Sequence, residues 1–221
     1  MKIFISMNFG QLTKLVLFSL GFVVVLVISA FLIFSEKSEL TNPGGIDIAR
    51  KNYGKEVTKY SKKYSIPSAY MMSLIMLESS GREHIKPRFE NHVYQKLLKL
   101  KKGEISRFEN LTSNDLKGFS KNEIRDLAKS YGPFQIMGYK AISLGISVYD
   151  FEGDNSIKYG ALWINREYGD LLRNGKFMDA FHLHNTGRVY PKNGKPKTHN
   201  PNYVKNGMEF MRYFSLGTET K

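Results

Sequence analysis

Residues 70–81 read YMMSLIMLESSG, an apolar segment that ends in a glutamate, two serines and a glycine. Met71, Leu74, Ile75 and Glu78 follow the i, i+3, i+4, i+7 spacing of one helical face. The face that should pack into the core therefore ends in a carboxyl group. Burial penalises the ionised form, so we expect Glu78 to stay protonated near neutral pH, as a glycosidase acid must. The segment alone also fits a half-exposed structural glutamate at a helix end.

The helical period recurs along the chain, whereas no strand pattern, internal repeat or low-complexity run of similar strength is present. Pro67 suits the first turn of a helix and Gly81 suits a left-handed C-terminal cap. Residues 102–119 are mixed and polar, and residues 187–202 are rich in proline, glycine and asparagine, which favours a long loop. The sequence predicts an all-α fold with helices at about 48–63, 67–80, 91–101, 120–129, 136–144, 154–173, 176–183 and 202–214.

Residues 15–34, LVLFSLGFVVVLVISAFLIF, contain no charged residue, proline, asparagine or glutamine. A run of about 20 apolar residues matches the ~30 Å hydrocarbon core of a bilayer. A cleavable signal peptide has a shorter apolar region of about 7–15 residues that ends at small residues, whereas bulky residues follow Ser29-Ala30 here. We therefore predict a retained transmembrane signal-anchor over 15–34.

The charges beside this segment predict its orientation. Lys2 and Lys14 precede it, so the positive-inside rule places residues 1–14 in the cytoplasm. The predicted organisation is then a short polar linker over 35–46 and one helical domain over 47–221. This domain is expected on the periplasmic or extracytoplasmic side of a single-pass inner membrane protein.

The composition limits the partners of the exported part. Residues 1–34 hold two lysines and no acidic residue, which leaves 31 basic and 20 acidic residues, a formal charge of +11, in residues 35–221. Anionic wall polymers or lipid headgroups are the partners that such a surplus favours outside the membrane, and a solvated basic surface is the alternative. The chain has no cysteine, which excludes disulfides and cysteine metal sites.

Several short motifs follow one another along the chain and are listed here in order: Glu78, Ser79 and Gly81; Gly132, Gln135, Ile136 and Met137; Asn155, Ile157, Gly160 and Ala161; Asn185 and Gly187; and PNYVKNGMEFM (201–211). Their order resembles the goose-type lysozyme and lytic transglycosylase superfamily, which cleaves the glycan strands of peptidoglycan. In that family the corresponding motifs are Glu-Ser-x-Gly at a helix end, Gly-x-x-Gln-Ile-Met, Asn-Ile…Gly-Ala and Tyr-Asn-x-Gly. The resemblance implies a lysozyme-like helical domain with Glu78 as the catalytic acid.

Two departures from the superfamily pattern are informative. Glu78 and Gly132 lie 54 positions apart, and the intervening PRFENHVY resembles a segment of a bacterial N-acetylmuramidase group, which also shares the pattern from Ser130 to Gly138. His184 stands where the family usually has tyrosine before Asn185. Its ring is still expected to stack on sugar.

Glu90 is the second candidate catalytic residue. A hydrolase that inverts the configuration at the anomeric carbon needs a second carboxylate as base. In the lytic transglycosylases that this sequence resembles, one carboxylate is sufficient. Glu90 either serves as that base or ties Arg88 or His92 in a structural contact. The sequence therefore leaves muramidase and lytic transglycosylase open.

The remaining candidate residues are expected to bind the glycan. Amides and backbone groups offer directional hydrogen bonds, glycines allow close approach, and aromatic rings offer flat apolar faces. The predicted substrate-binding residues are Ser79, Ser130, Tyr131, Gly132, Gln135, Met137, His184, Asn185 and Tyr190. No cofactor is expected, and no metal, because His182 and His184 diverge on a helix and lack a third ligand.

Three function classes compete. The first is a membrane-anchored peptidoglycan glycosidase acting on the β-1,4 bond between N-acetylmuramic acid and N-acetylglucosamine. The second is a catalytically dispensable, peptidoglycan-binding scaffold of an envelope or secretion assembly. The third, a nucleic-acid-binding protein, lacks a recognised motif, so no nucleic-acid partner is expected.

Overall fold

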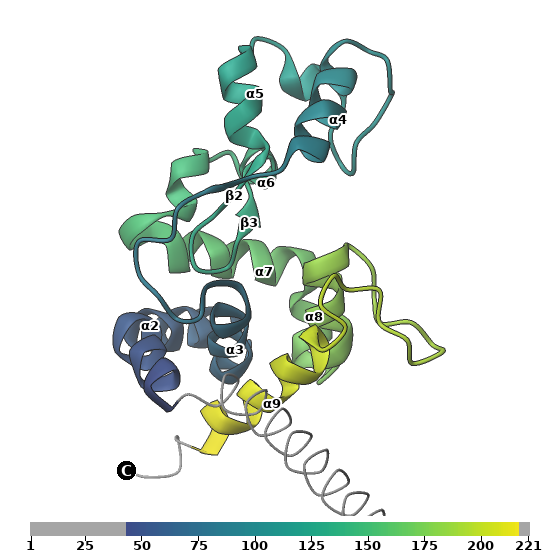
Figure 1. The fold of residues 1–221 in the computed structure, drawn as a ribbon. Coiled ribbons are helices and arrows are strands. Elements are labelled where there is room, and N and C mark those ends of the chain that lie inside the picture. Colours follow the sequence, from purple (N-terminus) through teal and green to yellow (C-terminus); the bar gives the residue numbers. More distant parts are fainter. Residues whose placement is uncertain (1–42, 217–221) are drawn as a thin grey trace, which may run out of the picture. The chain divides into compact units, whose positions relative to one another are not determined.

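The computed structural model describes residues 43–216, which are mostly helical (Figure 1). The predicted signal-anchor over 15–34, with its flanking residues 1–14, lies outside the described residues. Within residues 43–216, no helix is long and apolar enough to cross a membrane. The prediction of a predominantly helical fold is confirmed.

Eight α-helices follow one another in the described range, joined by three short 3-10 turns and three very short strands. The helices are α2 (Pro43–Tyr64), α3 (Ser68–Ser79), α4 (Asn91–Lys101), α5 (Lys121–Leu127), α6 (Lys140–Leu144), α7 (Ser156–Arg173), α8 (Phe177–Thr186) and α9 (Tyr203–Leu216). The 3-10 turns are η1 (Ser113–Leu116), η2 (Val148–Phe151) and η3 (Gly153–Asn155), and the strands are β1 (Arg88–Phe89), β2 (Lys129–Tyr131) and β3 (Ile136–Met137).

Helix α3 is buried nearly all round, which corrects the expectation of a single apolar face. Every residue from Tyr70 to Ile75 is buried. The polar Ser73 is tolerated among them because its hydroxyl donates a hydrogen bond to the Ala69 carbonyl at 2.6 Å. A helix that is apolar on all sides belongs in the centre of a protein. Helix α3 packs along α9, and α8 packs on both α9 and α7 (Figure 1). Glu78 thus lies in the last turn of a central helix.

A second apolar cluster lies around α4 and α5, at the opposite end of the described unit from α2, α3 and α9 (Figure 1). Its fully buried members include Leu97, Leu100, Leu116 and Ile124. The segment 102–119, which has no helical period, contributes to this cluster through η1 and through the Phe108–Leu111 bridge.

The structure contains a small antiparallel sheet that the sequence did not predict. Strand β2 pairs with β1 through Arg88–Ser130 and with β3 through Ser130–Met137. The predicted helices at 120–129 and 136–144 are therefore wrong over the residues of β2 and β3. The predicted linker over 35–46 is also wrong at its end, since α2 begins at Pro43, a residue type that the first helical turn accepts.

The β2–β3 hairpin turns at Gly132, where glycine is required for two reasons. Its φ is +66°, which disfavours any residue with a Cβ atom, and an added Cβ would lie 1.9 Å from the Phe151 carbonyl oxygen. The hairpin then places the Phe134 ring on Gly160 of α7, where an added Cβ would lie 2.3 Å from a ring carbon. Close packing at these two glycines holds the turn against α7.

Candidate active site

Glu78 lies where α3 leaves the core. The helix ends one residue later, because Ser80 adopts the left-handed conformation and its N–H bonds the Met76 carbonyl at 3.0 Å. The Glu78 side chain is 16 % exposed, so it is mostly buried without being fully enclosed. This combination suits a group that must exchange a proton with a bound molecule.

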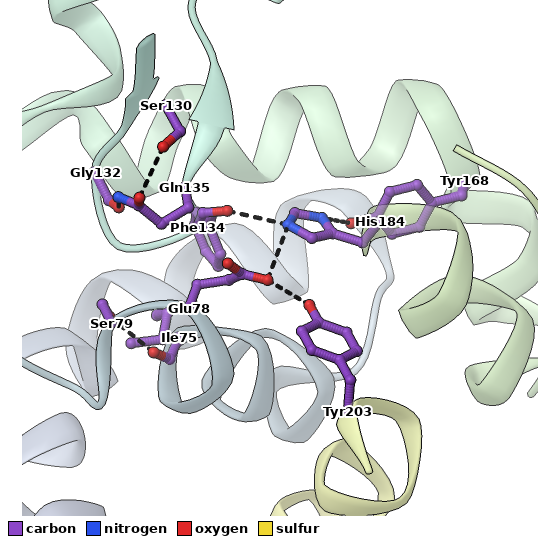
Figure 2. A network of polar contacts seen from close by, with 10 residues as sticks. All are labelled: Ile75, Glu78, Ser79, Ser130, Gly132, Phe134, Gln135, Tyr168, His184 and Tyr203. Atoms are coloured by element: carbon purple, nitrogen blue, oxygen red, sulfur yellow. Dashed lines mark hydrogen bonds and ion pairs between the residues drawn. The ribbon is translucent and has the colours of Figure 1, made fainter. Parts of the chain in front are cut away.

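Two side chains from distant parts of the chain meet the Glu78 carboxyl (Figure 2). The hydroxyl of Tyr203, the first residue of α9, donates a hydrogen bond to Oε1. Nε2 of His184, on α8, lies 3.8 Å from the same oxygen. Glu78 is therefore held from one side, by α8 and α9.

His184 is fixed by hydrogen bonds at both ring nitrogens (Figure 2). Nε2 donates to the Phe134 carbonyl at 3.0 Å, and Nδ1 accepts from the Tyr168 hydroxyl at 2.8 Å. Burial lowers the pKa of His184 to about 4, so the ring is neutral near neutral pH. The contact between His184 and Glu78 is then a close approach of a neutral ring, and no ion pair forms.

The environment raises the pKa of Glu78 to about 7, chiefly through burial. The Tyr203 hydrogen bond and the positive charge of Arg88 act in the opposite direction and lower it. A carboxyl with this pKa is protonated in a large fraction of molecules at neutral pH and can both give and take a proton. The sequence predicts that burial raises the pKa of Glu78, and the pKa in the structure is shifted in the same direction.

Ser130 and Gln135 hold the turn that lies beside Glu78 in Figure 2. The Ser130 hydroxyl donates to Gln135 Oε1 at 2.8 Å, and Gln135 Nε2 donates to the Gly132 carbonyl at 3.0 Å. Gln135 itself has a φ of +48°, an unusual conformation for a residue other than glycine. These bonds stabilise the strained turn, which is the role the structure gives to the Ser130 and Gln135 side chains.

Several side chains predicted to contact sugar are instead buried in the protein frame. Ser79 is 2 % exposed and donates to the Ile75 carbonyl at 2.7 Å, and Tyr131 is 1 % exposed and donates to the Asp126 carbonyl at 3.0 Å. The ring of His184 is also enclosed, with 5 % of its side chain exposed. The expectation of substrate contact is corrected for these side chains, and for Ser130 at 1 % exposure, because their polar atoms are already bonded inside.

The other predicted binding residues differ in position. Asn185 is exposed beside His184, and Met137 is half-buried against the α4–α5 cluster. Tyr190 lies elsewhere: its ring packs on His182, and it lines a separate cavity of about 520 Å³ with Met178 and Met208. The structure does not bring Tyr190 to Glu78, so the prediction that it belongs to the same site is corrected.

Glu90 is engaged with its neighbours in sequence. Its Oε1 lies 2.8 Å from Arg88 Nε, and its Oε2 lies 3.7 Å from His92 Nδ1. Its backbone N–H donates to the Ala128 carbonyl at 2.9 Å, which ties the start of α4 to α5. This is the structural contact that the sequence left open as the alternative to a catalytic base.

A cavity of about 810 Å³ lies between α2, residues 83–87 and residues 152–157. Gly132 and Pro133 form part of its wall, so it adjoins the turn that holds Gln135. Glu78 does not line it. The carboxyl with the displaced pKa, rather than this cavity, therefore defines the candidate site.

In residues 43–216, no group of three or more histidine, cysteine, aspartate or glutamate side chains is arranged to hold a metal ion. His182 anchors the 187–202 loop instead: Nδ1 bonds the Arg188 carbonyl at 2.7 Å, and Nε2 accepts from the Lys197 N–H at 3.0 Å.

Tyr203 and Tyr168 are the site residues that the sequence interpretation missed. Tyr203 lies within the segment 201–211 that carries the resemblance, which was a usable signal. Tyr168 lies inside α7, at a residue with non-helical φ and ψ of −151° and 22°. The glycine that follows, Gly169, is a weak signal of that break in the sequence.

Comparisons of the chain with protein-family models, with curated proteins and with solved structures found no match.

The displaced pKa of Glu78 makes a prediction about stability. A raised pKa in the folded state means that the protonated carboxyl favours folding, and that this contribution is lost as pH rises through about 7. Relative to a Glu78→Gln variant, the wild-type protein should therefore lose up to about 3 kcal/mol of unfolding free energy between about pH 5 and pH 8. Urea unfolding over this pH range measures the difference. The exposed Glu104, replaced by glutamine, is the control, and a difference independent of pH would contradict the prediction.

Tyr203→Phe is expected to raise the pKa of Glu78 further, because the lost hydrogen bond favours the charged form. The expected increase is about one pH unit, the size of a hydrogen bond to a charged group. Carbon-13 NMR titration of the Glu78 carboxyl checks it. Tyr53→Phe is the matched control, since the Tyr53 hydroxyl bonds the Arg82 carbonyl instead. An unchanged or lower pKa in Tyr203→Phe would overturn the role given to this hydroxyl.

Proposed function

We propose that this protein is a membrane-anchored, lysozyme-like glycosidase that cleaves the β-1,4 bond between N-acetylmuramic acid and N-acetylglucosamine in peptidoglycan. One feature carries the proposal: at the end of a buried helix, burial raises the pKa of the Glu78 carboxyl to about 7, while 16 % of the Glu78 side chain remains exposed. The motif order in the sequence supports the substrate, since it resembles enzymes that act on glycan strands.

The Glu78 carboxyl has the properties that one group needs to serve as acid and then as base. As acid, it gives its proton to the bridging oxygen while the bond between that oxygen and C1 of N-acetylmuramic acid breaks. The 6-hydroxyl of the same sugar then attacks C1, and its proton returns to the Glu78 carboxylate. The product is a 1,6-anhydro sugar and the enzyme is regenerated. A pKa near the working pH serves both steps.

The tyrosine and histidine beside Glu78 support this cycle. The Tyr203 hydroxyl bond stabilises the carboxylate that forms after the first proton transfer. The neutral His184 encloses the same Oε1 oxygen without adding a positive charge, which would lower the pKa of Glu78. The site therefore keeps a large fraction of Glu78 protonated at neutral pH.

The contacts of Glu90 favour lytic transglycosylation over hydrolysis. A base that activates water needs an unoccupied carboxylate oxygen facing the sugar. Glu90 instead pairs with Arg88 at 2.8 Å and lies 3.7 Å from His92. We therefore assign Glu90 a structural role in the 88–92 segment.

Mass spectrometry of the products from purified peptidoglycan tests the function. Products with 1,6-anhydro ends, lighter than hydrolytic products by one water molecule, are expected. Reducing ends would mean that the enzyme is a muramidase, and Glu90 would become the base to test. The absence of products from the wild-type protein would overturn the proposal in favour of a peptidoglycan-binding scaffold.

A further inference from the structure

Helix α2 packs on the rest of the described unit through one face. Ala49 and Val57 are fully buried on this face. Polar side chains of the same helix join it to the segment after α3, where Asn52 Nδ2 donates to the Gly81 carbonyl at 2.9 Å and Tyr53 donates to the Arg82 carbonyl at 2.6 Å. The orientation of α2 about its own axis is therefore determined by these contacts.

The opposite face of α2 is a row of exposed lysines. Lys51, Lys55, Lys59 and Lys62 are all exposed, and they lie within an arc of about 80° on a helix that turns about 100° per residue. Ile48, 49 % exposed, lies within the same arc at its N-terminal end. We call these five residues the lysine face.

Helix α2 is also far more basic than the rest of the exported part. Its 22 residues include six lysines and arginines and two acidic residues, a formal charge of +4. The whole of residues 35–221 carries +11. More than a third of the surplus charge is thus concentrated in one helix. Within the lysine face, one ion pair offsets a lysine: Lys59 Nζ lies 3.4 Å from Glu56 Oε2.

The position of α2 in the chain points to the occupant of this face. The uncharged segment 15–34 ends nine residues before Pro43, where α2 begins. Nine residue steps span at most about 30 Å. If residues 15–34 cross the membrane, the start of α2 lies within about 30 Å of the headgroups. The lysine face then meets the membrane surface at high effective concentration.

We propose that the lysine face of α2 binds the anionic headgroups of the membrane in which the protein is anchored. Rows of basic residues next to a membrane span are attracted to anionic lipid surfaces. An exposed isoleucine in a basic helical face suits insertion at the headgroup level. Headgroups are favoured over a wall polymer because the short connection between residues 15–34 and Pro43 keeps the lysine face close to the bilayer. The proposal rests on the predicted anchor and is independent of glycan cleavage.

Lysine footprinting of the full-length protein tests this surface. The protein is reconstituted into phosphatidylcholine vesicles with or without phosphatidylglycerol and treated with a membrane-impermeant amine reagent, and each lysine is quantified by mass spectrometry. The reactivity of Lys51, Lys55 and Lys62 should fall about fivefold in the anionic vesicles. The exposed lysines of the α4–α5 end, Lys96, Lys99 and Lys121, are internal controls that should not change.

Salt and cell wall provide the deciding comparisons. Protection should disappear in about 1 M salt, where charges are screened beyond about 3 Å. Equal reactivity in both vesicle types would overturn the proposal. Protection that arises only when purified peptidoglycan is added would also overturn it and assign the lysine face to a wall polymer. Equal protection of the control lysines would show non-specific adsorption and count against it.

Discussion

Replacing Glu78 by glutamine is expected to lower the rate of peptidoglycan cleavage about a thousandfold, the scale of losing a general acid. Glutamine keeps the size of the side chain and can still accept the Tyr203 hydrogen bond at its oxygen. It has no acidic proton to give to the leaving oxygen. The change therefore removes the chemistry while leaving the packing at the end of α3 nearly intact. Release of soluble muropeptides, measured by liquid chromatography, gives the rate.

Glu90→Gln is the matched control for this variant. Glu90 is also a partly exposed glutamate, with 23 % of its side chain accessible, but its carboxylate pairs with Arg88. Loss of a surface ion pair of this kind should change the rate less than about fivefold. A large loss in Glu90→Gln together with hydrolytic products would replace the mechanism with one that uses two carboxylates. Retained cleavage in Glu78→Gln would refute the assignment of the acid.

Gly132→Ala is expected to have the largest effect on stability, a loss of about 4 kcal/mol in the free energy of unfolding. Two costs combine. The φ of +66° is unfavourable for alanine, and the new Cβ would lie 1.9 Å from the Phe151 carbonyl oxygen. Because that oxygen belongs to the backbone, a side-chain rotation cannot relieve the overlap. The β2–β3 turn would have to move away from η2, and urea unfolding measures the cost.

Gly145→Ala separates the two costs. Gly145 has nearly the same φ, +65°, but no atom lies within 4 Å of its added Cβ. Its loss should be about 1 kcal/mol, from the backbone conformation alone. Equal losses at the two positions would mean that the close approach to Phe151 does not matter. In that case, the turn beside Glu78 is held by its own hydrogen bonds rather than by η2.

Local signals in the sequence predicted most of the helices, because helix formation depends on neighbours within one turn. The predicted helix at 91–101 coincides with α4, and those at 67–80 and 202–214 match α3 and α9 within two residues at either end. The special position of Glu78 was also predictable, since an apolar segment that ends in a carboxyl is unusual. These inferences needed no knowledge of how distant segments meet.

Predictions that required distant contacts were less successful. The sheet was missed because two of its strands are two residues long and the third is three, too short for an alternating pattern, and because β2 pairs with β1 across 40 to 42 positions. Ser79, Tyr131 and His184 have residue types that suit sugar binding, but their burial depends on neighbours from other elements. Tyr190 was assigned to the wrong site for the same reason: the path of the 187–202 loop depends on its contacts with His182.

The sequence by itself determined the helical framework and the chemical character of one residue, Glu78, because propensity and period act over about four residues. The tertiary structure alone decided what surrounds that residue. Tyr203 reaches Glu78 across 125 positions, and His184 bonds the Phe134 carbonyl across 50. Such contacts exist only once α3, α8 and α9 pack together. The same packing buries the carboxyl, and this burial is the main cause of its raised pKa.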